Sequence, residues 1–271
     1  MASGHWTNGG GDRDINTATN YSGGAAPGNS EDMRFISDFT GGSTGPNTDM
    51  AALTLIGLAL LYVGEGYTED IGGTGNDLDI SANHVWHRGT GKLWYKDGSG
   101  ITDLFTVDST APSPTTSVAN ITGSAVTLLQ VLRGGVTVDG AGTVTNVVVG
   151  QRTSGQTDAN LTLTTGTTVT DLKMYGGAAA SSKAVTTATV FGGTLTQDTA
   201  TITTLYVFGG RVNFNFAGTI TNVYHYGGVI DVTRSGGAKT FTNYYKAPGA
   251  RLIGENNGLL SIGTKWDVSN E

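Results

Sequence analysis

The chain has 271 residues, of which 43 are glycine, 37% are hydrophobic and 14% are charged, and it contains no cysteine. This composition accommodates one elongated domain or two compact ones, and it excludes disulfides, thiolate metal ligands and a cysteine nucleophile. The formal charge of −7 comes without a basic stripe, so binding to nucleic acid by phosphate neutralisation is not expected.

Residues 1–49 are predicted to form an extended N-terminal arm. They are rich in Gly, Asn, Ser and Asp, a pattern typical of irregular chain with turns, and one short strand is expected at 32–38. An arm that buries little of its own surface gains order on a partner; the alternative is a mobile terminus. The partner-binding candidates are its isolated aromatic residues, Trp6, Tyr21, Phe35 and Phe39.

Residues 50–110 are predicted to form a small β-rich attachment region divided by glycine-rich turns. The uncharged run at 50–64 is shorter than the roughly 20 residues that a membrane helix needs, so no membrane insertion is expected, and a strand or a helix remains open for 53–63. The segment from Trp86 to Trp94 is similar to a hairpin. The first ten residues have no basic segment followed by an apolar core, so no secretory signal is predicted and we expect synthesis in a cytoplasm.

A linker is expected at 111–117, because Pro112 and Pro114 disfavour both a helix and a central strand. After it, a degenerate repeat fills 118–250. Seven segments there place an apolar residue before a threonine, continue with apolar/polar alternation, and close on Gly-Gly or a substitute such as Pro248-Gly249. The anchoring threonines recur every 16 to 25 residues, at Thr127, Thr145, Thr170, Thr186, Thr203, Thr221 and Thr242.

This self-similarity predicts an all-β protein, a parallel β-solenoid (β-helix) of about seven irregular coils preceded by the arm and the small β-rich region. Alternation turns one set of side chains inward, each glycine pair forms a corner, and stacking at ~4.8 Å pairs every strand with the coils above and below. Residues 251–271 are expected to supply one last strand pair and a C-terminal cap, with Trp266 covering the open end.

Three surface patterns suggest ligands. Gly72–Asp77 is similar to one calcium-binding β-roll repeat, which makes Asp77 and Asp79 candidate calcium ligands, although a simple turn explains the same residues. Thr-x-Thr triplets such as Thr201/Thr203 and Thr219/Thr221 resemble the ice-binding face of some β-solenoid antifreeze proteins, but threonine also suits any exposed strand. Four aromatic residues precede glycine pairs and predict either a packing ladder or subunit contact, or a glycan platform: Tyr175, Phe191, Phe208 and Tyr226.

Neither catalysis nor a cofactor is expected. Residues 118–250 contain five aspartates and no glutamate, and Asp171 and Asp231 fall at different points of their coils, which leaves no carboxylate pair suited to glycoside hydrolysis. His84 and His87 are predicted on opposite faces of a strand, which disfavours a shared metal. His225 replaces an inward aliphatic residue, so we expect it to be buried and hydrogen-bonded.

The stretches DMAALTLIGLALLYVGEGYTEDIGGTGNDLDIS (49–81) and LWYKDGSGITDLFTVDS (93–109), followed by the Gly/Thr-rich solenoid, resemble bacteriophage virion proteins. The resemblance is to capsid decoration and fibre-like proteins, in which an N-terminal region attaches to the particle and a β-rich body projects. It implies a location on the capsid surface, a homotrimer, and the major capsid protein or another virion protein as partner.

The sequence thus favours a capsid decoration (cement) protein attached through its N-terminal region. The alternatives are a glycan-binding adhesin or tailspike-like protein, and an ice-binding β-solenoid.

Overall fold

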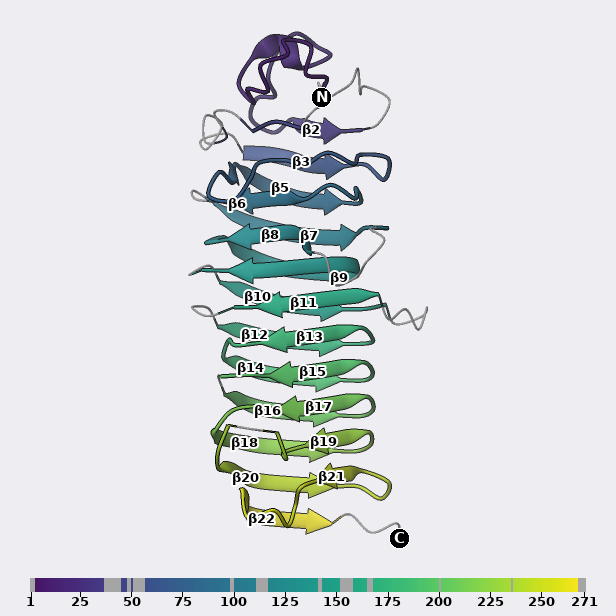
Figure 1. The fold of residues 1–271 in the computed structure, drawn as a ribbon, viewed down its shortest axis with the longest axis vertical. Coiled ribbons are helices and arrows are strands. Elements are labelled where there is room, and N and C mark those ends of the chain that lie inside the picture. Colours follow the sequence, from purple (N-terminus) through teal and green to yellow (C-terminus); the bar gives the residue numbers. More distant parts are fainter. Residues whose placement is uncertain are drawn as a thin grey trace.

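The structure is a computed structural model of the chain, 58% of which is strand. It describes residues 3–36, 45–47, 50, 57–97, 100–110, 117–140, 143–151, 158–164, 168–199, 201–234 and 236–267. The coils stack into one rod with the N-terminus at one end and the C-terminus at the other (Figure 1). The predicted all-β parallel β-solenoid is confirmed, with about nine turns rather than about seven.

Two parallel sheets run the length of the rod, and β9 belongs to both. The first sheet consists of β1 (Ser3–His5), β2 (Asp32–Phe35), β3 (Gly57–Val63), β5 (Ser81–His87), β7 (Ile101–Asp108), β9 (Ala125–Asp139), β10 (Val144–Val149), β12 (Val169–Met174), β14 (Val185–Val190), β16 (Ile202–Val207), β18 (Gly218–His225), β20 (Lys239–Lys246) and β22 (Leu260–Asp267). The second sheet consists of β4 (Leu78–Asp79), β6 (Leu93–Lys96), β8 (Ser117–Thr122), β9, β11 (Ala159–Leu163), β13 (Ala178–Ser181), β15 (Thr194–Gln197), β17 (Arg211–Phe214), β19 (Val229–Asp231) and β21 (Arg251–Ile253).

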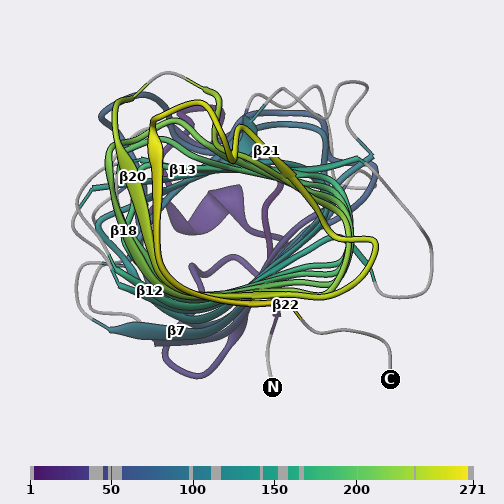
Figure 2. The same cartoon turned by 90° about the horizontal axis from the view of Figure 1, so that it is seen from below.

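Each repeated segment supplies one first-sheet strand, and its anchoring threonine lies at a bend in that strand. In β16, Ile202 and Leu205 are fully buried while the two residues between them, Thr203 and Thr204, both face outward. Two successive outward residues break the period of two, so the strand turns a corner there. Viewed along the rod, the coils therefore superpose into a closed, rounded outline (Figure 2).

The glycine pairs form the corners between the first and second sheets, as predicted. Gly210, between β16 and β17, has a φ of +70°, and a Cβ at this position would lie 2.5 Å from the carbonyl oxygen of Gly193 in the coil before. Only glycine accepts both the positive φ and this close approach of neighbouring backbones.

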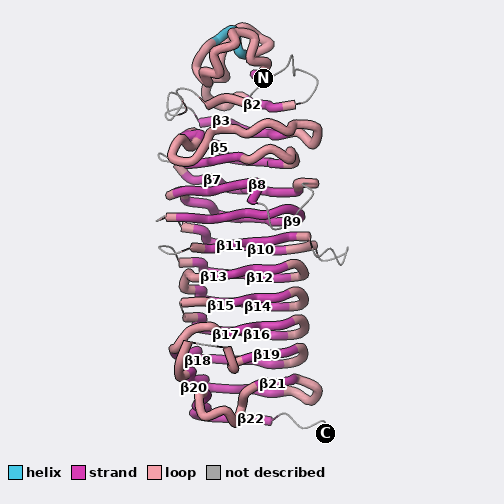
Figure 3. The backbone as a smooth tube through the Cα atoms, viewed as in Figure 1, coloured by secondary structure: helices cyan, strands magenta, loops and turns pink. Residues whose placement is uncertain are grey.

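The N-terminal third differs from the prediction, because the solenoid begins earlier than the repeat. Strands β2 to β7 pair in parallel with the coils on either side, so these strands are continuous with the later coils rather than a separate region (Figure 3). The prediction of a hairpin from Trp86 to Trp94 is wrong, because β5 belongs to the first sheet and β6 to the second. The short strand expected at 32–38 is confirmed as β2. The run for which the sequence allowed either a strand or a helix contains strand β3, at 57–63.

The arm prediction is also corrected, because residues 3–31 fold across the end of the first coils as an irregular cap that includes a short 3-10 helix, Ala18–Asn20 (Figures 1 and 2). At the other end, β21 and β22 form the expected last strand pair and extend the two sheets. Of the predicted linker, 111–116 lie outside the described residues and Ser117 already starts β8. Within the described ranges, no helix has the length and apolar character that a membrane crossing requires.

Candidate functional site

The four aromatic residues predicted to form a column do so. They follow the last inward residue of β12, β14, β16 and β18, and their rings stack with centroid distances of 5.0, 5.1 and 4.9 Å and interplanar angles of 2°, 10° and 12°. Phe191, Phe208 and Tyr226 are 43–47% exposed, so the ladder lies on the outside of the rod. Its members are Tyr175, Phe191, Phe208 and Tyr226.

A second ladder runs beside the first and was not predicted. Its centroid distances are 4.8, 4.7 and 4.3 Å, with interplanar angles of 5° to 9°. Strand register aligns its members across β16, β18, β20 and β22: Tyr206, Tyr224, Tyr245 and Trp266. Trp266 therefore extends an outer ladder and does not cover the open end, as the sequence had suggested. Alignment of the coils on their glycine pairs would have revealed Tyr206 and Tyr224.

The two ladders form one continuous surface, which we call the aromatic face: Tyr175, Phe191, Tyr206, Phe208, Tyr224, Tyr226, Tyr245 and Trp266. Tyr206 and Phe208 flank the fully buried Val207, so both rings leave the same side of the strand. A polar column borders the face, where Asn243 Nδ2 donates a hydrogen bond of 2.9 Å to Asn222 Oδ1. None of the eight residues carries a charge at neutral pH.

Ring orientation bears on the glycan-platform prediction. A pyranose stacks on an open ring face, whereas each middle ring of either ladder turns both faces toward its neighbours. Ring edges and tyrosine hydroxyls are what the middle of the face offers to solvent. This geometry favours the packing-ladder or subunit-contact interpretation.

The partner-binding candidates in the N-terminal region are core residues, which corrects that prediction. Trp6, Tyr21 and Phe35 are 1%, 3% and 0% exposed. Trp6 packs edge-on against Tyr21, with ring centroids 5.5 Å apart, and at a tilt of 41° against Phe35, with ring centroids 6.0 Å apart. The Tyr21 hydroxyl donates to the carbonyl oxygen of Ile15 at 2.7 Å, and burial raises its pKa. These rings hold the cap onto the rod and present no surface to a partner. Phe39 lies outside the described residues.

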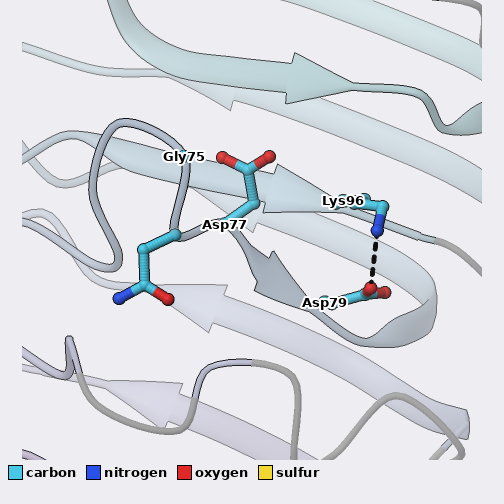
Figure 4. A pocket seen from close by; sticks show the side chains of 5 residues that line it. Gly75, Asp77, Asp79 and Lys96 are labelled. Atoms are coloured by element: carbon cyan, nitrogen blue, oxygen red, sulfur yellow. Dashed lines mark hydrogen bonds and ion pairs between the residues drawn. The ribbon is translucent and has the colours of Figure 1, made fainter.

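The calcium candidates line a small open cavity of about 190 Å³ beside β4 and β6 (Figure 4). Lys96 Nζ donates to Asp79 Oδ2 at 2.9 Å, so a lysine ammonium already neutralises one carboxylate. Burial raises the pKa of Asp77. The backbones of Gly73 and Asn76 bond to each other in a tight turn. Calcium takes six to eight oxygen ligands, and no cluster of three or more metal-binding side chains occurs in the described part of the chain, so nothing here favours calcium.

Two histidine predictions are confirmed. His84 is exposed and His87 is fully buried, on opposite faces of β5. His225 is fully buried; its Nε2 donates to the carbonyl oxygen of Gly228 at 3.3 Å, and its Nδ1 accepts from the Tyr244 hydroxyl at 3.0 Å. Burial lowers the pKa of both His87 and His225 to about 4, so both rings are neutral at pH 7.

The aspartates of the repeat are dispersed, each with its own partner. Asp171 on the first sheet pairs with Lys173 at 2.6 Å, whereas Asp231 on the second sheet pairs with Arg211 and also accepts from Thr233. Two carboxylates on different sheets do not face a common substrate position.

The threonine triplets face outward around buried residues, as expected, but their array is interrupted. The coil of β14 has Ala184 in place of the first threonine, and the paired register between β16 and β18 starts only at Thr204 and Asn222. The second threonine of each triplet also lies at the bend in the strand. The triplets therefore do not form one flat, unbroken lattice.

Comparisons of the chain with protein families, with curated proteins and with solved structures gave no match.

Proposed function

We propose that the protein is a structural component of a bacteriophage virion, a capsid decoration protein that attaches to the particle through its N-terminal end. The observation that carries the proposal is the shape of the molecule, a long rod with one end closed by a folded cap. The residues that recur from coil to coil serve to stack the coils. Residues 1–100 hold 12 acidic and 5 basic residues, which concentrates the negative charge of the chain at the capped end. Repulsion and attraction of charges set which surfaces a protein docks on, so this end suits a basic partner surface.

Because Trp6, Tyr21 and Phe35 are buried, attachment relies on polar groups on the outside of the cap and of the first coils. Glu65 is an example: its side chain is 56% exposed and pairs with Arg88 at 2.9 Å. Exposed charges of this kind contribute to the rate and specificity of docking, and their effect falls with ionic strength.

The test is co-sedimentation of the purified protein with expanded capsids that lack it, at low and at raised salt. The double variant Glu65→Lys and Glu69→Lys is expected to bind at least tenfold more weakly, while Glu255→Lys in the last coils binds like the unmodified protein. Equal binding by all three proteins would refute attachment through the N-terminal end. Failure of the unmodified protein to bind at low salt would refute the decoration role itself.

A further inference from the structure

The aromatic face is the largest set of exposed rings on the described surface. Four of its eight residues are 40–47% exposed: Phe191, Phe208, Tyr226 and Trp266. With ~200 Å² for a fully exposed aromatic side chain, these four alone leave roughly 350 Å² of ring surface in water. A patch of a few hundred Å² is about the largest that a monomeric soluble protein exposes, and such a patch is often a functional surface.

The spacing of the face identifies the kind of partner. Neighbouring rings in the two ladders repeat every 4.3 to 5.1 Å along the rod, because each ring belongs to the next coil. A partner that makes the same contact at every coil needs a surface with the same repeat. A second copy of this chain has that repeat by construction, whereas an ordinary globular surface does not.

Charge points to the same partner. The chain carries a net charge of −7, so two copies repel each other where their acidic surfaces meet. The eight residues of the aromatic face are uncharged. Of the lysines on the same strands, Lys173 pairs with Asp171 at 2.6 Å, Lys265 pairs with Glu255 at 2.8 Å, and Lys246 follows Tyr245. The face itself therefore adds no acidic repulsion between two copies.

The exposed rings supply a little under half of the area that an interface needs. Each partner in a stable interface buries about 800 Å², and the four most exposed rings supply roughly 350 Å². The partly buried tyrosines and the polar column beside them, formed by Thr204, Asn222, Asn243 and Thr264, extend the contact. Aromatic residues are enriched in the cores of such interfaces, where tyrosine hydroxyls find hydrogen-bond partners at the edge.

We propose that the aromatic face is the surface through which copies of this chain associate side by side, with their long axes aligned. The proposal concerns the purified protein and stands independently of the virion role.

The first experiment measures the mass of the full chain in solution by light scattering at several concentrations. The unmodified protein is expected to be a dimer or trimer, and the triple variant Phe191→Thr, Phe208→Thr and Tyr226→Thr is expected to be a monomer. Threonine keeps the strand propensity, and circular dichroism verifies that the variant is folded. The matched control is Ile101→Thr, since Ile101 is 61% exposed at the start of β7 and lies on the other side of the bend in the first sheet; it is expected to keep the assembled mass.

A second measurement does not depend on the triple variant. Because the chain has no cysteine, single variants Phe208→Cys and Ile101→Cys can be labelled with a maleimide reagent. Labelling at position 208 is expected to be at least tenfold slower than at position 101, and to accelerate on dilution. A monomeric unmodified protein, or equal labelling rates at both positions, would overturn the proposal. Binding of an oligosaccharide by a monomeric protein, lost in the triple variant, would overturn it in favour of a glycan site.

Discussion

The glycine corners give the sharpest test of the solenoid, because two similar glycines differ in one respect. Gly210 and Gly249 both have positive φ, +70° and +84°. A Cβ on Gly210 would lie 2.5 Å from the carbonyl oxygen of Gly193 and 2.8 Å from the carbonyl carbon of Gly192, whereas a Cβ on Gly249 would meet nothing within 4 Å. Replacement by alanine therefore separates the cost of the backbone conformation from the cost of the contact between coils.

The positive φ costs alanine about 1–2 kcal/mol, and the stiffer unfolded chain returns about 0.4–1 kcal/mol. Gly249→Ala is thus expected to lower the free energy of unfolding by about 1 kcal/mol. Gly210→Ala adds an overlap with backbone that cannot rotate away, and such overpacking costs a further 1–3 kcal/mol, for a total of about 3 kcal/mol. Gly57→Ala serves as the control, since Gly57 has no positive φ and open space at its Cβ position; it is expected to be neutral or slightly stabilising.

Urea unfolding followed by circular dichroism measures the three differences. If Gly210→Ala and Gly249→Ala lose the same free energy, the close approach of neighbouring coils at the corner is not what requires glycine, and the reasoning fails.

Three further outcomes are expected. Burial lowers the pKa values of His87 and His225 to about 4, so below pH 6.5 the unfolded chain binds more protons than the folded chain. The free energy of unfolding should therefore fall by about 4 kcal/mol from pH 7 to pH 5. A free energy of unfolding that does not change with pH in urea titrations would contradict this. Phe214→Ala removes a fully buried ring and should cost about 3–5 kcal/mol, seen as a lower urea midpoint. Tyr224→Thr removes stacking on both Tyr206 and Tyr245 and should cost about 1–3 kcal/mol in the same assay; an unchanged midpoint would show that the ladder does not stabilise the coils.

The repeat could be predicted because each of its coils obeys the same local rules. Inward residues such as Leu205 and Val207 alternate with outward ones, and Gly209-Gly210 closes the strand, so periodicity alone indicates the solenoid. The bend at the anchoring threonine was not predicted, since Thr203 and Thr204 give no local sign that both face outward.

The N-terminal coils were missed because their corners lack the glycine pair. At the end of β7, the Ser109 hydroxyl donates to the carbonyl oxygen of Gly89 at 2.6 Å and joins two coils that no sequence period connects. The cap was mistaken for an arm for a related reason: Trp6, Tyr21 and Phe35 are too far apart in sequence to show that they pack together. Their contacts arise from tertiary folding rather than from a repeat.

The second ladder was missed because register, not sequence spacing, brings its members together. Tyr206, Tyr224 and Tyr245 are separated by loops of unequal length, and only the pairing of β16 with β18 and of β18 with β20 places each ring over the next. An outward aromatic residue in one coil has no evident function in sequence; four of them in register form a surface.

The two proposed surfaces lie on different coils, and this separation has a consequence. The acidic residues Glu65 and Glu69 belong to the first coils, whereas the aromatic face begins at β12 and ends at β22. Copies joined along the aromatic face would carry their capped ends side by side when aligned in the same direction, so that several weak electrostatic contacts act together on one particle. Linked contacts raise the overall affinity 10²–10⁴-fold without any new contact. The triple threonine variant should therefore bind capsids far more weakly than the assembled protein although its N-terminal end is unchanged, whereas Glu65→Lys with Glu69→Lys should leave the assembled mass intact.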